Sequence, residues 1–225
     1  MRFQDAARDA RAVVYAGIQA DPLVVRAATL LADATQAERL LARAAMNGER
    51  TDGATWRRIF PTLFGEDADE TLRRHAERVL AASLEVAERG EAARSQYRGA
   101  VVEELTARLL ARRAGPEAPV RRERRVLFDG VPAEIHPYDV TVESASAPEV
   151  FDCKWGARGI NADVLNQLDD VRTHAADEEV ELAVAMVVFD AGRSCRLRLD
   201  QSTAEHAGIR LVAIESLDEL AKGRS

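Results

Sequence analysis

The chain carries its positive charge almost entirely on arginine, and one of its two lysines, Lys154, lies in an apolar run beside Asp152, Cys153 and Trp155. Retention of lysine at this position predicts a need for an ammonium group, because guanidinium is larger, planar and does not lose its proton. Side chains of a strand alternate between its two faces, so Asp152 and Lys154 are expected to share one face. These residue types and this spacing therefore predict a carboxylate and an ammonium side by side on one face of a strand.

Asp139 lies in the preceding apolar segment, residues 137–142. If the two segments are neighbouring strands, Asp139 and Asp152 converge on a hard divalent cation, which prefers carboxylate oxygens. Such a metal polarises a phosphoryl oxygen and lowers the pKa of a bound water. Lys154 would then orient that water or stabilise charge in the transition state. The three residues together predict hydrolysis of phosphodiester bonds.

The sequence Pro137-Tyr138-Asp139, followed by Asp152-Cys153-Lys154, resembles the signature of the PD-(D/E)XK nucleases, the restriction-endonuclease-like superfamily. Tyr138 separates the proline from the aspartate, and members of the superfamily vary at that proline. The resemblance covers about residues 93 to 215. It implies an α/β fold with a three-layer α/β/α core, a central mixed sheet and dependence on Mg²⁺, with Mn²⁺ as a substitute.

The same resemblance implies further site residues. The family commonly places a glutamate on its first core helix, and residues 99–103 fit the G-x-x-x-E form of that motif. Glu104 belongs to a polar i, i+4 series typical of a solvated helix face, whereas Glu103 borders the apolar face, so we assign Glu103. The implied catalytic set is Glu103, Asp139, Asp152, Lys154 and Gln167, with Glu103, Asp139, Asp152 and the main-chain carbonyl of Cys153 as metal ligands. The neighbouring His136 is more typical of a strand residue than of a proton carrier.

The elements that position these residues follow from hydrophobic periodicity and turn signals. We expect the nuclease-like domain to cover residues 93–225. A helix over 91–113 spans the start of this domain, and strands, a helix over 161–175 and more strands follow it. The expected strands cover 120–128, 133–143, 149–155, 182–189, 196–199 and 209–214, and a short helix covers 217–221. Asp129-Gly130 predicts a hairpin between the first two strands.

Residues 1–92 predict an all-α segment, because Ala, Leu, Arg and Glu dominate it. The expected helices cover 3–19, 22–32, 36–46, 56–64 and 67–89. No residue in this segment suggests chemistry. We therefore expect a helical bundle that docks a protein partner, mediates self-association or regulates the following domain.

The composition limits the classes of partner. A net charge of −7 and a pI of about 5.3 argue against coating of nucleic acid by charge alone. The densest basic run, residues 121–125, fits a solvated strand edge and a phosphate-contacting strip equally well. The chain has only two cysteines, which predicts a protein without disulfides in a reducing cytoplasm. It shows neither a signal-peptide pattern nor a long apolar stretch, so we expect a soluble protein without a membrane anchor.

The leading functional prediction is a Mg²⁺-dependent endonuclease that acts on DNA, since DNA enzymes dominate the superfamily. A regulated effector in restriction or anti-phage defence fits the acidic balance and the helical segment. Nothing in the motif distinguishes DNA from RNA, so an RNA-directed nuclease is an alternative. Another is a catalytically silent subunit that binds DNA or has a structural role, although the intact Asp139, Asp152 and Lys154 favour an enzyme.

Overall fold

The computed structural model describes residues 1–7, 9–48, 52–133, 136–204 and 206–222. The chain forms two compact units: a sheet unit, Met1–Asp9 with Thr106–Ser225, and a helical unit, Ala10–Leu105. The boundary falls inside one helix, α7 (Glu91–Ala111). The division expected at residue 93 therefore differs from the observed one, which places the first nine residues with the sheet.

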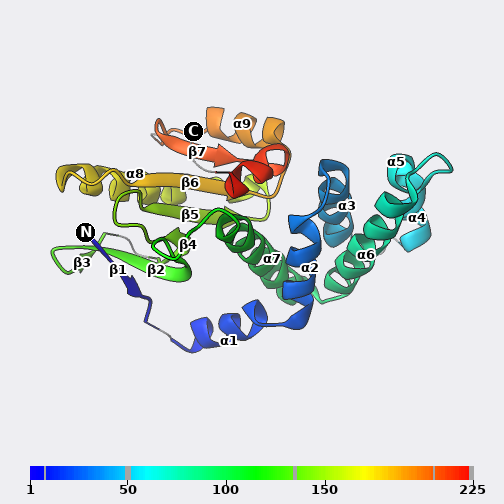
Figure 1. Cartoon of the computed structure of the whole chain (residues 1–225), viewed down its shortest axis with the longest axis horizontal. Coiled ribbons are helices and arrows are strands. Elements are labelled where there is room, and N and C mark those ends of the chain that lie inside the picture. Colours follow the sequence, from blue (N-terminus) through cyan, green and yellow to red (C-terminus); the bar gives the residue numbers. More distant parts are fainter. Residues whose placement is uncertain (8, 49–51, 134–135, 205, 223–225) are drawn as a thin grey trace. The chain divides into compact units, whose positions relative to one another are not determined.

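The sheet unit contains a mixed sheet of seven strands among the described residues (Figure 1). The strands are β1 (Arg2–Asp5), β2 (Val120–Phe128), β3 (Val131–Pro132), β4 (Tyr138–Val142), β5 (Glu149–Lys154), β6 (Ala183–Val188) and β7 (Ile209–Val212). Their order is β1-β2-β4-β5-β6-β7, with β3 paired to β2. Pairing is antiparallel from β1 to β5 and parallel from β5 to β7. The predicted α/β class with a mixed sheet is confirmed.

Helix α8 (Ala162–Asp177) packs against this sheet through one apolar face. The side chain of Asn161 caps its first turn by accepting a hydrogen bond from the Val164 backbone N–H. Helical spacing then brings its apolar residues onto one side, where they join residues of the strands in a single core. This core includes Leu165, Leu168, Val171 and Ala175 of α8 together with Tyr138, Val150, Val184, Met186 and Val188 of the sheet.

Strand β5 lies inside the sheet, between antiparallel β4 and parallel β6. It ends at Lys154, whose carbonyl accepts a hydrogen bond from the Phe189 N–H at 2.8 Å. A 3₁₀ turn, η1 (Ala157–Gly159), leads from β5 to α8, and α9 (Gly192–Asp200) leads from β6 to β7. A second 3₁₀ segment, η2 (Ile214–Ala221), follows β7. Pairing with a strand on each side and its buried side chains fix β5 in the middle of the sheet.

The helical unit contains α1 (Ala10–Gln19), α2 (Pro22–Ala32), α3 (Gln36–Asn47), α4 (Gly53–Ile59), α5 (Pro61–Phe64), α6 (Glu70–Ala87) and the first part of α7. Side chains of Asp21, Thr35, Asp52 and Asp69 cap four of these helices. One core cluster joins α3 to α6 and consists of Leu41, Ala45, Trp56, Leu63, Ala76 and Leu80.

Two predicted elements are wrong. The helix expected over 3–19 begins only at Ala10, because Arg2–Asp5 pairs with β2 as strand β1. The strand expected over 196–199 is part of α9. Its alternation of arginine and leucine does not mark two sheet faces, since Leu197 is 59% exposed whereas the neighbouring Cys195 is fully buried.

The predicted turn after β2 is confirmed, but the strand that returns from it is the short β3 (Val131–Pro132) and not the predicted strand over 133–143. Asp129 and Gly130 have φ angles of 49° and 84°, the left-handed values that a tight two-residue hairpin turn requires. The strand expected over 133–143 is shorter than predicted, as β4 covers Tyr138–Val142, and residues 134 and 135 lie outside the described residues.

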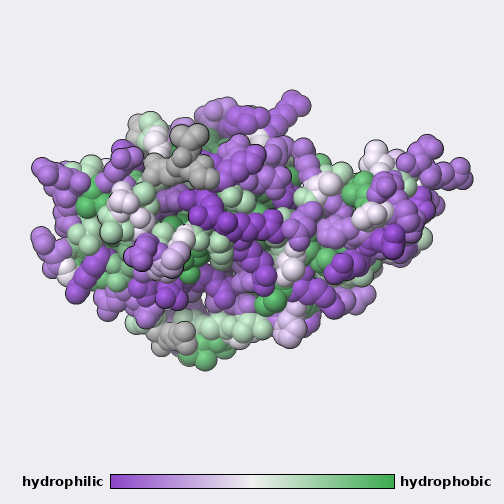
Figure 2. All heavy atoms as spheres, viewed as in Figure 1, coloured by the Kyte–Doolittle hydropathy of each residue, from purple (hydrophilic) through white to green (hydrophobic). Residues whose placement is uncertain are grey.

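The face of the molecule seen in Figure 2 is mostly hydrophilic, with apolar atoms scattered over it. Within the described ranges, no helix combines the length and the apolar character needed to span a membrane.

Replacement of Leu168 tests the packing of α8. This side chain is fully buried, so Leu168→Ala should lower the free energy of unfolding by about 2 to 5 kcal/mol through lost burial and a cavity. Urea unfolding followed by circular dichroism measures the change. Thr173→Ala, at an exposed position of α8, is the control and should stay within about 0.5 kcal/mol of the parent. Equal effects of the two changes would contradict this packing.

Candidate functional site

A pocket of about 430 Å³ lies where β4 and β5 meet α8. Most of the predicted site residues of the sheet unit line this pocket. Helix α8 adds two further carboxylates, Asp163 and Asp170, to its wall. The polar residues of its wall include Asp139, Asp152, Lys154, Asp163, Gln167 and Asp170. Four of the five predicted catalytic residues, all except Glu103, are thus brought to one pocket.

Asp152 and Lys154 form an ion pair on the pocket wall. The Lys154 Nζ lies 2.5 Å from Asp152 Oδ1, and the Asp152 residue is only 7% exposed. Among the described residues, this buried oxygen accepts no hydrogen bond of normal geometry, so its polar environment is supplied by charge. Buried carboxylate oxygens normally have a hydrogen-bond donor. Here the Lys154 ammonium at 2.5 Å compensates by charge, and the carboxylate keeps lone pairs for a further cation.

Burial and charge act in opposition at this pair. Burial raises the pKa of Asp152 above its usual range, and the nearby Lys154 offsets this effect only in part. Burial also disfavours the ammonium of Lys154, but the charges of Asp139 and Asp152 outweigh it and raise the pKa of Lys154. Lys154 is therefore a fixed positive charge at neutral pH, and the Asp152 carboxylate gains from added positive charge.

Asp139 ties β4 to β5 beside the ion pair. Regular pairing of the two strands ends at Val140 and Phe151, and beyond that point Asp139 Oδ2 accepts a hydrogen bond from the Cys153 backbone N–H at 2.6 Å. The Cys153 side chain is buried, and its thiol donates to Thr106 Oγ1 at 3.5 Å. The side chain of Cys153 thus packs into the interior, and a role for its carbonyl as a ligand stays a prediction.

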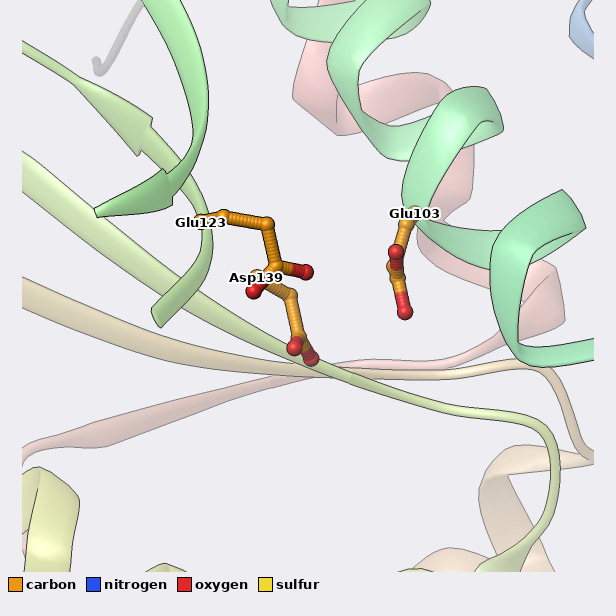
Figure 3. A group of neighbouring side chains, drawn as sticks. All are labelled: Glu103, Glu123 and Asp139. Atoms are coloured by element: carbon orange, nitrogen blue, oxygen red, sulfur yellow. The ribbon is translucent and has the colours of Figure 1, made fainter. Parts of the chain in front are cut away.

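Glu123 is an acidic neighbour that the sequence did not reveal. The pairs Arg122 with Val140 and Arg124 with Tyr138 place it opposite Asp139 on β2, and carboxylate oxygens of the two residues lie within 4.8 Å of each other (Figure 3). Like charges directly opposite on a sheet are destabilising. Glu123 also has a φ angle of 54°, a costly value for a residue other than glycine. A bound cation would relieve the repulsion.

The signal that points to Glu123 is its position as a lone acid among four arginines in residues 121–125. Its register with Asp139 could not be read, because the connection between β2 and β4 sets that register and includes the additional short strand β3.

Glu103 belongs to the helical unit, and Figure 3 labels it on α7. It is buried, at 4% exposure. Within its own unit, Tyr15 Oη donates to Oε1 at 2.5 Å and Gln19 Nε2 donates to Oε2 at 2.7 Å. These contacts hold the carboxylate against α1. Membership of Glu103 in the site stays a prediction.

Gln167 lines the pocket, but its side chain is hydrogen-bonded to the backbone of the segment before β4. Its Nε2 donates to the His136 carbonyl at 3.1 Å, and its own carbonyl accepts from Tyr138 Oη at 3.2 Å. Both bonds link α8 to the segment that leads into Asp139. This geometry fits a residue that positions β4. His136 is exposed on the pocket wall.

Gly159 packs on the stem of Lys154. A Cβ atom at Gly159 would lie 2.8 Å from Lys154 Cβ and 2.9 Å from its Cγ and Cδ, closer than real side chains approach. Asp190 holds the turn in place, since its Oδ2 accepts from the Ala157 N–H at 3.0 Å and its Oδ1 from the Ala191 N–H at 2.9 Å. The turn therefore confines the lysine stem, and only glycine fits at this point.

No protein-family model matches the sequence, and no curated protein matches it. Among solved structures, the chain is similar to protein VC1899 from Vibrio cholerae, with 16% sequence identity and a TM-score of 0.50. The match covers 98% of this chain and 56% of that protein, so the chain spans little more than half its length. At this identity the likeness concerns the fold alone.

The two lysines offer a direct test of the packing around Lys154. In protein labelled with ¹³C-lysine, two side-chain signals are expected, and Lys222→Arg identifies the one from Lys222. Gly159→Ala should shift the Lys154 signal and leave the Lys222 signal in place, because the added methyl displaces the lysine stem. Gly115→Ala, where a Cβ meets no atom within 4 Å, should shift neither. An unmoved Lys154 signal in Gly159→Ala would refute the contact.

Proposed function

We propose that this protein is a Mg²⁺-dependent endonuclease that hydrolyses phosphodiester bonds of DNA. The observation that carries the proposal is the ion pair of the buried Asp152 carboxylate with Lys154, at 2.5 Å, in a pocket shared with Asp139. The resemblance of these residues to the PD-(D/E)XK signature gives the reaction class. The antiparallel-to-parallel mixed sheet, with the site on β4 and β5, supports a restriction-endonuclease-like core.

The donor set fits a hard divalent cation. Asp139 and Asp152 offer carboxylate oxygens at the pocket, Glu123 adds a carboxylate beside Asp139, and Mg²⁺ is typically bound through one or two carboxylates. When bound, the metal would supply charge stabilisation at the phosphoryl group and an activated water. We also propose the Cys153 carbonyl and Glu103 as ligands, on the resemblance alone.

The residues of the chain have separate roles in this proposal. Lys154, held protonated by its two acidic neighbours, stabilises the charge that develops on the phosphoryl oxygens or orients the attacking water. Asp139 fixes the separation of β4 and β5 through the Cys153 N–H. Gln167 positions the segment before Asp139 through the His136 carbonyl. Only Lys154 and the carboxylates need to meet the substrate or the metal.

The helical unit is proposed as a regulatory or partner-binding module, consistent with an effector in restriction or anti-phage defence. Its link to the chemistry would be Glu103, whose carboxylate is bound by Tyr15 and Gln19 of α1. A partner that displaces α1 would change the environment of this carboxylate.

Metal binding can be measured without any substrate. Calorimetric titration with Mg²⁺ or Mn²⁺ should show binding to the parent protein, and Asp139→Asn and Asp152→Asn should weaken it by more than about tenfold, because each removes an anionic ligand. Asp177→Asn, at an exposed position of α8, is the matched control and should bind as the parent does. Equal binding by all four proteins would exclude this metal site.

The same titration assigns the two additional carboxylates. Glu123→Gln should weaken binding, since its carboxylate faces Asp139 within 4.8 Å, and Glu103→Gln should do so if the implied ligand set is complete. Circular dichroism checks that each variant retains its fold. Unchanged affinity in either variant removes that residue from the ligand set.

Cleavage of plasmid DNA in the presence of Mg²⁺ tests the activity. Lys154→Ala should slow cleavage by about 10²- to 10³-fold, as expected for loss of a preorganised charged donor, and should retain metal binding. Lys222→Ala is the matched lysine control and should cleave at the parent rate. If the parent and Lys154→Ala cleave equally, or if neither cleaves DNA or RNA with Mg²⁺ or Mn²⁺, the proposed function is wrong.

A further inference from the structure

Four exposed arginines lie on the turn that precedes α8 and on α9: Arg158 on η1, and Arg193, Arg196 and Arg198 on α9. Within the described part of the chain, none of them has a carboxylate at ion-pair distance. Many other arginines are neutralised, as Arg124 is by Asp5 and Glu143. In a chain with a net charge of −7, this group is a local concentration of uncompensated positive charge.

Arg158 and Arg198 border a hollow of about 450 Å³ between η1 and α9. Its wall is formed by Ala157, Arg158, Ser194, Leu197, Arg198 and Gln201. Ser194, Leu197 and Arg198 of α9 and its C-cap residue Gln201 follow helical spacing and form one face of the helix. Leu197 is 59% exposed on that face, so the hollow offers cationic, hydrogen-bonding and apolar contacts together.

A smaller hollow of about 200 Å³ connects this face to the start of α8. It shares Arg198 and Gln201 with the first hollow and is lined further by Asn161 and Ala162. The next residue, Asp163, lines the pocket of Lys154. Arg198 is held in place here because its Nε donates to the Ile160 carbonyl at 3.1 Å. Consecutive residues at the start of α8, Ala162 and Asp163, thus line the smaller hollow and the Lys154 pocket in turn.

We propose that the face formed by η1 and α9 binds the phosphate backbone of a nucleic-acid strand and leads it to the Lys154 pocket. This inference deepens the proposed function and rests on it for the identity of the strand. Guanidinium groups suit phosphate because they donate two parallel hydrogen bonds and stay charged. Ser194 and Gln201 add neutral donors, and Leu197 can contact a sugar or base. The pocket itself is rich in carboxylates, so the attraction for a polyanion comes from this neighbouring face.

Arg196 is not part of the binding face. Its guanidinium and the Glu215 carboxylate both lie 3.3 Å from the position that a Cβ of Gly192 would occupy, so an acidic group is close to it. The proposal therefore uses the side of α9 that carries Arg198.

The test measures binding rather than cleavage. Fluorescence anisotropy with labelled single-stranded and duplex DNA, in EDTA and over a range of salt concentrations, compares the parent with Arg158→Gln/Arg198→Gln. The double variant should bind at least about tenfold more weakly, and its plot of log affinity against log salt should lose about 2 units of slope on duplex, because each phosphate contact contributes about 0.9. The control, Arg11→Gln/Arg78→Gln, removes two exposed arginines of the helical unit and should bind as the parent does.

Several outcomes would overturn the proposal. They are no binding by the parent, unchanged affinity and slope in the double variant, and an equal loss in the control. Competition by polyglutamate that is as strong as competition by unlabelled DNA would also overturn it, because the partner would then be an acidic protein. The plasmid assay separates the two claims: weaker binding by the double variant with no cleavage by the parent keeps this face and rejects the nuclease. Cleavage by the parent with unchanged binding in the double variant rejects this face alone.

Discussion

The burial of Asp152 beside Lys154 is the constraint on which the sheet unit depends. Withdrawal of two opposite charges from water costs free energy that their attraction repays only if they are held at close range. Three features hold them in place. Strand β5 is paired on both sides, and Asp139 accepts a hydrogen bond from the Cys153 backbone N–H. Gly159 of η1 packs against the Lys154 side chain. The fold therefore maintains an arrangement of charges that is unfavourable in isolation.

Much of this arrangement could be predicted from local patterns. The alternation within residues 149–155 placed Asp152 and Lys154 together, and the pair lies on one pocket wall. The helical spacing of Leu168 and Val171 gave the buried face of α8, and Asp129-Gly130 gave the turn after β2. Each of these signals lies within a few residues of the feature that it specifies, where periodicity and turn chemistry act directly.

The features that could not be predicted depend on contacts between distant parts of the chain. Nothing near Arg2–Asp5 indicates a strand, since its pairing partner is β2. The approach of Glu123 to Asp139 depends on the register of two strands, and the restriction at Gly159 depends on the path of η1 against Lys154. In α9, four alternating residues were too few to separate a strand from a helix whose outer face carries Leu197.

The pairing of β1 with β2 also has a consequence for the order of folding. Arg2 pairs with Leu127, and the helical unit occupies the chain between them. During synthesis, β1 leaves the ribosome long before its partner strand exists. The helical unit, which is rich in local contacts, can fold in that interval. Closure of this edge of the sheet is therefore a late event, and until then the nascent chain carries an unpaired strand that a chaperone or another chain can bind.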